Sequence, residues 1–229
     1  MSSIRKFVKY ALGTFVPNKY FLVNTRCRTK ILMLTFDDGP LPESTPMILD
    51  ALDHYNAKAT FFVLGKNAKK HPELILEIVK RGHDLGNHTY SHPRREEILR
   101  EEWTNELRAT DEILKSILGA TTQLYRPPRG KLKLFDFIEL WRNGITSVLW
   151  NRDPEDFKST TEDIKRWFVK NQLCSGDIIL LHDTSAATVL ALPSILKLLK
   201  DRQFEFISCS KALKRSWKSK MTFSNHSSS

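Results

Sequence analysis

The amino-acid sequence predicts an α/β protein in which about seven parallel strands form a distorted or incomplete (β/α) barrel. Short apolar runs alternate along the chain with segments whose apolar residues recur at helical spacing. Strands that alternate with helices pair in parallel through right-handed crossovers. Polar residues directly follow five of the apolar runs, as expected where the carboxyl ends of strands converge on the mouth of a barrel.

The predicted strands are short apolar runs that end at turn-forming or charged residues. The first covers residues 31–36 and ends abruptly in Asp37, Asp38 and a Gly-Pro pair. The other runs of this kind are residues 59–64, 83–87, 121–125, 145–150, 177–181 and 205–208.

The predicted helices lie between these strands and carry apolar residues on one side. Gly82 and Gly119 follow two of them, as glycine often does directly after a helix. Residues 159–162 have the form of a capping box and predict the start of another helix. The segments with helical spacing are residues 42–55, 72–81, 95–118, 132–142 and 192–199.

The net charge of +10 belongs to the two ends of the chain. Residues 1–30 hold seven Lys or Arg and no acidic residue, and five Lys or Arg without an acidic residue follow Glu205. The part between them is about neutral, and no aromatic-basic recognition motif appears, so nucleic-acid binding is not expected. We predict a basic N-terminal segment (1–30), one domain (31–210) and a basic, then Ser-rich tail (211–229).

Residues 4–16 place apolar side chains at helical spacing beside Arg5, Lys6 and Lys9, which predicts a basic amphipathic helix. Because Lys9 interrupts the apolar region and no clear cleavage site follows, the segment is a poor signal peptide. It is also too short to span a membrane. Two interpretations stay open: the helix packs on the domain, or it lies peripherally on an anionic membrane surface.

Three cysteines, at positions 27, 174 and 209, show neither close pairing nor the spacing of a metal site. Such sparse use favours a reducing compartment. We expect the protein to be cytoplasmic or peripheral at the inner membrane face, and an extracytoplasmic location stays open. We also expect it to be a monomer.

Two adjacent acids and two histidines indicate a metal site. Because successive strand residues point to opposite sides, Asp37 and Asp38 can lie together only if the chain turns there, or if a cation and a base arrangement hold them. His88 and His92 are four residues apart, so a helical turn would direct both imidazoles to one point. Two imidazoles and a carboxylate leave positions open for water or substrate, and zinc is the first candidate. Alone, the acids also fit a capping loop and the histidines a surface pair.

Five segments resemble, in order, the five motifs of the polysaccharide deacetylases, carbohydrate esterase family four. They are residues 35–40 (TFDDGP), 88–93 (HTYSHP), 126–130 (RPPRG), 153–157 (DPEDF) and 180–183 (LLHD). The resemblance spans residues 31 to about 208. It implies a distorted (β/α) barrel that removes acetyl groups from an N-acetylated glycan with a divalent metal, Zn²⁺ first and Co²⁺, Ni²⁺ or Mn²⁺ as alternatives.

The resemblance also implies roles for single residues. Asp38, His88 and His92 would hold the metal, and Asp37 would be the base that activates the attacking water. Arg126 would pair with Asp37 and keep it ionised and aimed; the alternative role for such an arginine is a salt bridge at a loop.

The proton donor would be His182, which would protonate the departing amine while Asp156 orients its ring and favours the protonated form. Leu180 and Phe157 would line a small pocket for the acetyl group, although both would also fit an apolar core.

The third motif would contribute to substrate binding through Pro128 and Arg129. A backbone N–H near Arg129 would meet the oxyanion. This chain has Arg129 where many members of the family have Tyr, and Phe157 where Trp is usual. Our hypothesis is that Arg129 recognises a negatively charged sugar, since guanidinium matches such groups in bidentate fashion.

Three functions therefore stay open. The first is removal of N-acetyl groups from an exopolysaccharide, peptidoglycan, a chitooligosaccharide or a lipid-linked precursor. The second keeps the same site but hydrolyses another amide bond. The third is a catalytically silent barrel that only binds glycan.

Overall fold

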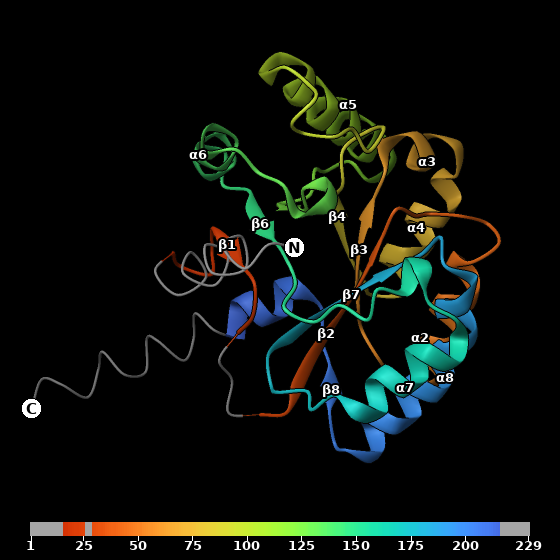
Figure 1. Cartoon of the computed structure of the whole chain (residues 1–229). Coiled ribbons are helices and arrows are strands. Elements are labelled where there is room, and N and C mark those ends of the chain that lie inside the picture. The colour runs from red at the N-terminus through yellow and green to blue at the C-terminus, as the bar shows by residue number, and fades with distance from the viewer. Residues whose placement is uncertain (1–15, 26–28, 216–229) are drawn as a thin grey trace, which may run out of the picture.

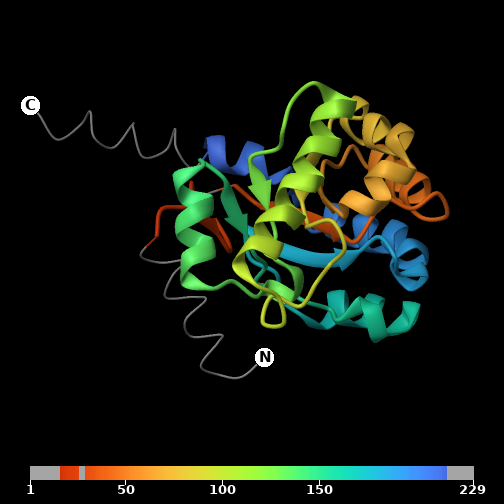
Figure 2. The ribbon, with the colours of Figure 1, turned by 90° about the horizontal axis from the view of Figure 1, so that it is seen from above.

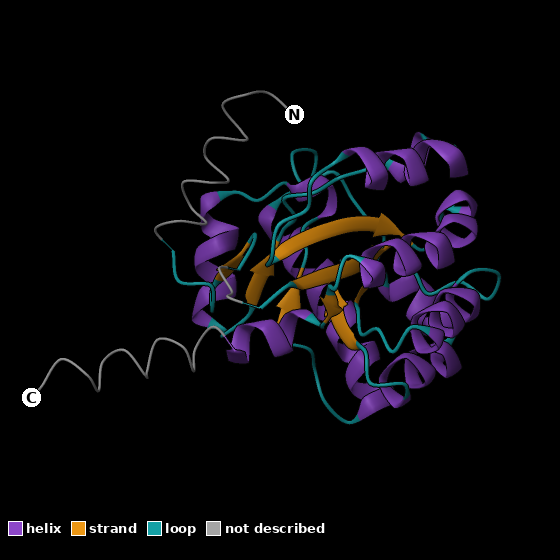
Figure 3. Ribbon diagram, turned by 90° about the horizontal axis from the view of Figure 1, so that it is seen from below, coloured by secondary structure: helices purple, strands orange, loops and turns teal. Residues whose placement is uncertain are grey.

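The computed structural model describes residues 16–25 and 29–215, and strands at its centre are surrounded by helices (Figures 1 and 3). The strands are β1 (Phe21–Leu22), β2 (Ile31–Asp37), β3 (Thr60–Val63), β4 (Asp84–Asn87), β5 (Leu124–Tyr125), β6 (Thr146–Val148), β7 (Asp177–His182) and β8 (Glu205–Phe206). Their order is β1-β6-β5-β4-β3-β2-β7, β8 also pairs with β2, and these pairs are parallel. The predicted parallel α/β architecture is confirmed.

Helices cover the outside of this sheet (Figure 2). They are α2 (Thr45–His54), α3 (Gly65–Lys70), α4 (Pro72–Lys80), α5 (Arg100–Leu118), α6 (Leu134–Arg142), α7 (Thr161–Lys170) and α8 (Ala186–Asp201). Two 3-10 turns, η1 (Pro128–Gly130) and η2 (Asp156–Lys158), follow β5 and β6. Within the described residues, no helix has the length and apolar character needed to cross a membrane.

The barrel closes between β6 and β7 without a regular ladder. Arg152, just after β6, donates its N–H to the carbonyl of Ile178 and accepts the N–H of Leu180. Asp177 accepts hydrogen bonds from the side chains of Asn151 and Arg152, both at 2.6 Å. Because the seam has only an isolated bridge and side-chain hydrogen bonds in place of a regular ladder, the barrel is distorted, as the sequence predicted.

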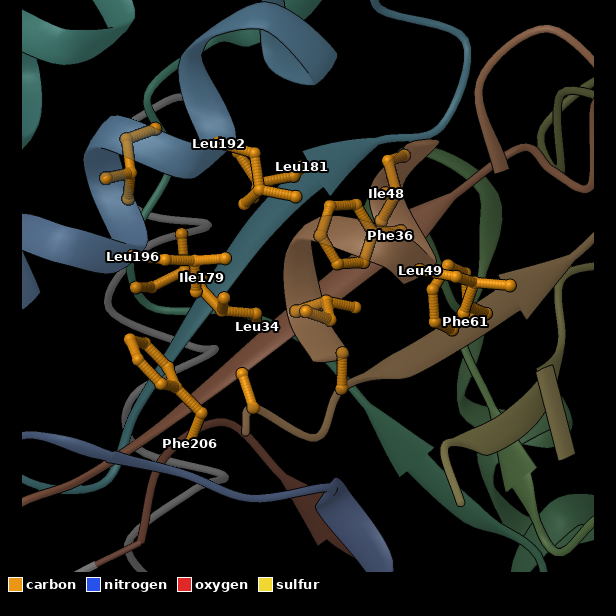
Figure 4. Packing of buried hydrophobic residues seen from close by; sticks show 14 of the residues in the cluster. Leu34, Phe36, Ile48, Leu49, Phe61, Ile179, Leu181, Leu192, Leu196 and Phe206 are labelled. Atoms are coloured by element: carbon orange, nitrogen blue, oxygen red, sulfur yellow. The ribbon is translucent and has the colours of Figure 1, made fainter. Parts of the chain in front are cut away.

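Alternation along the strands separates an inner from an outer core. The inner cluster contains Met33 of β2 and Ile178 of β7. The outer cluster packs β2, β3 and β7 against α2 and α8, and Figure 4 shows Phe36, Leu181 and their neighbours within it. By the same alternation, the last residues of β2 and β7, which are register partners, also face the interior.

The domain boundaries differ from those expected. Strand β1 lies inside the segment 1–30 and pairs with β6, so the domain begins before residue 31. Residues 209–215 are helical, and Ala212 is buried in the inner cluster, so the domain also extends beyond residue 210. The predicted amphipathic helix falls, apart from Val16, outside the described residues, as do Cys27 and the tail from residue 216. Cys174 and Cys209 are free thiols.

Other elements shift for local reasons. Helix α3 was not expected because its sequence, GKNAKK, lacks apolar periodicity. Helix α8 begins at Ala186, six residues before the expected start, because the side chain of Ser185 accepts the N–H of Thr188 and caps it. Pro193 therefore lies inside the helix instead of in its first turn.

Candidate active site

Strand β2 brings two adjacent carboxylates to the mouth of the barrel. Asp37 ends the strand and is buried. Asp38 has a left-handed backbone with φ 74°, so the chain turns directly after the strand. Both carboxylates therefore reach the same imidazole: Asp37 Oδ2 and Asp38 Oδ1 lie 3.6 Å and 3.5 Å from His88 Nε2.

Asp38, His88 and His92 converge on one point. Each offers a ligand atom, and these atoms lie within 4.8 Å of one another, which no other group of His, Cys, Asp or Glu among the described residues matches. The expected helical turn between the histidines is wrong. Residues 88–92 form a loop in which Thr89 and His92 adopt φ 71° and 65°.

The chemistry of this cluster fits a divalent cation. Asp38 Oδ1 is buried without a hydrogen-bond partner, which is costly unless something else binds it. His88 Nδ1 lies 2.7 Å from the carbonyl oxygen of Arg126, so Nδ1 donates and the lone pair of Nε2 faces the cluster. Burial lowers the pKa of His88 to about 3, which keeps the ring in its neutral, metal-ligating form. The donor set suits zinc.

Helix α5 supports the loop of the two histidines through Asn87. The side chain of Asn87 accepts the N–H of Thr89 at 2.8 Å and donates to Asp111 at 2.9 Å and to the carbonyl of Leu107 at 3.0 Å. Thr89 Oγ1 in turn accepts the N–H of His92. Nothing in the sequence analysis singled out Asn87 or Asp111, because their contact joins segments more than twenty residues apart.

Arg126 holds the carboxylate of Asp37 from inside the barrel. Its guanidinium is fully buried and donates to Asp37 Oδ1 and to Thr35 Oγ1, each at 2.7 Å. It also lies over the ring of Phe62, 4.1 Å from the centroid. Burial raises the pKa of Asp37, although the charge of Arg126 acts to lower it. The result is a base of raised basicity that is fixed in direction.

His182 and Asp156 form the second pair of the site. Asp156 begins η2 and is buried; its Oδ1 lies 2.7 Å from His182 Nδ1, and its Oδ2 accepts the N–H of His182 at 2.7 Å. Burial acts to lower the pKa of His182, but the hydrogen bond and charge of Asp156 outweigh it and raise the pKa to about 9. The imidazole therefore carries two protons at neutral pH, with Nε2 free to donate one.

A further carboxylate, Asp183, supports the turn of the two acids. Its N–H donates to the carbonyl of Asp37 at 2.9 Å, and its carboxylate accepts the hydroxyls of Ser44 and Thr45, each at 2.6 Å. A Cβ at Gly39 would lie 2.0 Å from Asp183 Oδ2, so the turn rests directly on this carboxylate. Asp183 is the last residue of the LLHD motif (180–183), but no pattern in the sequence predicts a role for it.

The residues expected to bind substrate lie at different depths. Leu180 is buried in the inner cluster, two residues before His182. Phe157 is exposed and meets the ring of His182 edge-on, with centroids 5.7 Å apart, so its placement in an apolar core is wrong. Pro128 is buried, whereas Arg129 is exposed and has φ 56°.

Comparisons with known proteins agree with this geometry. The family model for polysaccharide deacetylase matches residues 25–135. A peptidoglycan-N-acetylglucosamine deacetylase of Bacillus cereus is 35% identical over 204 residues, which cover 86% of this chain and 95% of that protein. The chain belongs to the polysaccharide deacetylase family. Its fold is therefore that of carbohydrate esterase family four, as the five motifs implied.

Two further members of the family extend the comparison. Another peptidoglycan-N-acetylglucosamine deacetylase of Bacillus cereus is 37% identical over 76% of this chain, which spans 65% of the length of that relative. The solved structure of the Bc1960 peptidoglycan N-acetylglucosamine deacetylase superposes with a TM-score of 0.79 and 34% identity, covering 82% of this chain and 90% of that one.

Proposed function

We propose that this polysaccharide deacetylase is a metal-dependent hydrolase that removes N-acetyl groups from an N-acetylated glycan. The observation that carries the proposal is the arrangement of three groups around one point. The possible metal ligands Asp38, His88 and His92 lie beside the Asp37–Arg126 pair, and the protonated His182 stands at the end of the neighbouring strand. These are the parts that hydrolysis of an amide requires: an activated water, a base and an acid.

Asp38, His88 and His92 would hold the divalent metal, with zinc as the first candidate and Co²⁺, Ni²⁺ or Mn²⁺ as alternatives. When bound there, the metal would supply Lewis acidity, which makes water acidic near neutral pH and polarises a carbonyl. Because His88 Nδ1 is committed to the carbonyl of Arg126, the ring cannot turn its ligand nitrogen away.

Asp37 would take the proton of the attacking water. Its Oδ1 is held by Arg126, which leaves Oδ2, on the side of His88, to accept that proton. Arg126 stays charged through the reaction and keeps the carboxylate in one orientation. Burial raises the pKa of Asp37 and so favours its neutral, protonated form. The site therefore promotes transfer of the proton from water to this carboxylate.

His182 would give a proton to the leaving nitrogen. Its Nδ1–H is bound by Asp156, so Nε2–H is the proton that can be transferred. Asp156 also accepts the backbone N–H of His182, which fixes the ring on its strand. Protonation makes the amine a good leaving group and prevents the tetrahedral species from returning to amide.

We propose N-acetylglucosamine units of peptidoglycan or a related glycan as the substrate, because the matched relatives named above are peptidoglycan deacetylases. The exposed Arg129 adds a cation to this region and supports a negatively charged glycan over a neutral one. This part of the proposal would be contradicted if the protein released acetate from a neutral chitooligomer and from an anionic polymer at equal rates, and if Arg129→Ala left both rates unchanged.

Acetate release tests the proposal. The protein, stripped with a chelator and reloaded with Zn²⁺ or Co²⁺, is assayed on N-acetylated chitooligosaccharide and on peptidoglycan. We expect release only after reloading and a loss of at least about 10²-fold in Asp37→Asn, with the exposed Glu43→Gln as matched control. Glycan binding without acetate release would indicate the silent barrel, and full activity of Asp37→Asn would overturn the mechanism.

A further inference from the structure

Helix α6 carries an uncovered apolar stripe on its outer side. Leu134, Ile138 and Trp141 follow one another at helical spacing, and Phe135 lies beside them. The exposed fractions are 72% for Leu134, 66% for Phe135 and 48% for Trp141, while Ile138 is half-buried. The opposite side of the helix is held by the barrel.

This stripe is more concentrated than the other exposed apolar residues of the described chain. Those on α2, α4, α7 and α8 number at most two to a helix. Leu99 is the most exposed of these residues, but it precedes α5 and is not part of α6. Contiguous exposed apolar surface of this kind marks an interaction site.

Cations flank the stripe. Lys133 precedes α6 and Arg142 ends it; both are exposed, and no described residue forms an ion pair with either. The nearby acid Glu139 is already neutralised by Arg100. The partner of this surface must therefore be both apolar and negatively charged at its boundary.

Strand β1 and the described residues just before it lie beside the same helix (Figures 1 and 2). The ring of Tyr20 meets Trp141 with centroids 5.5 Å apart, and Phe21 meets Phe137 at 6.0 Å. Tyr20 and Phe21 therefore lie against this edge of α6.

We propose that the outer side of α6 is a membrane-docking surface that seats the protein on an anionic lipid bilayer. Leu134, Phe135 and Trp141 enter the boundary between headgroups and acyl chains, where an aromatic ring such as that of Trp141 is favoured. Lys133 and Arg142 contact the phosphates. A second copy fits less well, because a symmetric contact would bring the unpaired cations of both copies together.

Vesicle co-sedimentation of the full chain tests the apolar part. The probes are phosphatidylcholine vesicles with and without phosphatidylglycerol. We expect binding to the anionic vesicles and at least a threefold loss in the double variant Leu134→Ser/Phe135→Ser. The matched control is Val169→Ser/Leu190→Ser, whose side chains are 59% and 63% exposed on α7 and α8. Equal binding by both double variants would overturn the proposal.

A charge pair of variants tests the headgroup contact. Lys133→Glu/Arg142→Glu should weaken binding and flatten its salt dependence, whereas Lys69→Glu/Lys70→Glu, with the same charge change on α3, should not. Thermal unfolding by circular dichroism shows whether each variant keeps its fold. A loss of the same size in both charge variants would mean nonspecific attraction and would contradict docking through α6.

A dye placed on the stripe separates the membrane from the other occupants. An environment-sensitive fluorophore is attached at Phe135→Cys, with Cys27→Ser and Cys174→Ser to remove competing thiols. We expect a blue shift only when anionic vesicles are added, and none at Leu190→Cys. A blue shift without vesicles would show that another part of the chain covers the stripe. One that grows with protein concentration would show a second copy. Both results would overturn the proposal.

Discussion

His182 keeps its second proton because Asp156 holds it. The ring is buried, and burial alone would drive the proton off. One oxygen of Asp156 binds Nδ1–H and the other binds the main chain of His182. The same contact therefore sets both the charge and the direction of the ring.

If His182 is the proton donor, as proposed, its pKa should set an upper pH limit for the reaction. The pKa is raised to about 9, so the acid form predominates below that pH and is lost as pH rises through it. In Asp156→Asn the raising charge is gone and burial remains, so we expect the alkaline limb of kcat/KM to move down by about one pH unit or more. Profiles measured at saturating metal check this. If the alkaline limb of the kcat/KM profile stays at the same pH in Asp156→Asn, its position is set by the ionisation of a group other than His182.

We expect Asp183 to influence the proposed metal site through the turn that it supports. Its carboxylate binds Ser44 and Thr45 and lies against Gly39, next to Asp38. In Asp183→Asn one hydroxyl loses its acceptor, and the turn can shift. We expect about 10- to 100-fold weaker Co²⁺ binding, measured by absorption titration, with secondary structure retained. Affinity equal to that of the wild type would limit Asp183 to a role in folding.

The residues proposed to carry the chemistry are visible as patterns in the sequence, whereas the residues that hold them in place are not. Asp37, His88 and His182 each follow an apolar run, which is a local and visible pattern. Asn87 and Asp183 act by side-chain hydrogen bonds to distant segments, and such contacts leave no periodicity in the sequence.

At the scale of elements, side chains from neighbouring strands pack in sequence inside the barrel and hold Asp37 in place. Gly86 of β4 leaves room for the ring of Phe62 on β3, and the ring carries the guanidinium of Arg126, which follows β5. Arg126 then binds Asp37 on β2. Four strands thus position one carboxylate.

Gly86→Ala should disturb this stack from its base. The added Cβ would lie 2.3 Å from Phe62 Cδ1, so the ring must move. We expect a loss of about 1–3 kcal/mol in the free energy of unfolding, measured in urea, together with reduced acetate release because Arg126 loses its platform. Unchanged stability and activity would show that the ring relocates without consequence.

The bounds of helices and strands with a strong apolar periodicity were predicted to within a few residues. Elements without such a periodicity were not predicted. Helix α4 has Leu74, Ile75 and Ile78 on its buried side, and its observed bounds differ from the prediction only at its end. Strand β1 has two residues, too few for any pattern, and pairs only because tertiary contacts place it beside β6.

For the whole molecule, the metal should act as a ligand of the folded state. The three proposed ligands, Asp38, His88 and His92, come from two separate segments, 37–40 and 88–92, that meet only in the folded chain. At about 100 times its dissociation constant, the metal should stabilise the fold by about 2.7 kcal/mol. For a chain of this size, that corresponds to a rise of roughly 5–10 °C in Tm.

Scanning calorimetry of the stripped and reloaded protein checks this expectation. Asp38→Asn should lose most of the rise, because an amide oxygen binds a cation more weakly than a carboxylate. Glu43→Gln, exposed on the loop that leads into α2, should keep it. A rise of equal size in Asp38→Asn would place the stabilising ion elsewhere.

Strand β2 is bonded to β3, β7 and β8. A single residue inserted near Ile31 would have to be absorbed before Asp37, or every later side chain of the strand would exchange inside for outside. Three partners resist that slippage together, whereas the seam beside Arg152 is joined by an isolated bridge and a few side-chain hydrogen bonds. Insertions or deletions of one residue should therefore be tolerated at the seam but not in β2. The register of β2 fixes which side chains of the strand face the barrel interior.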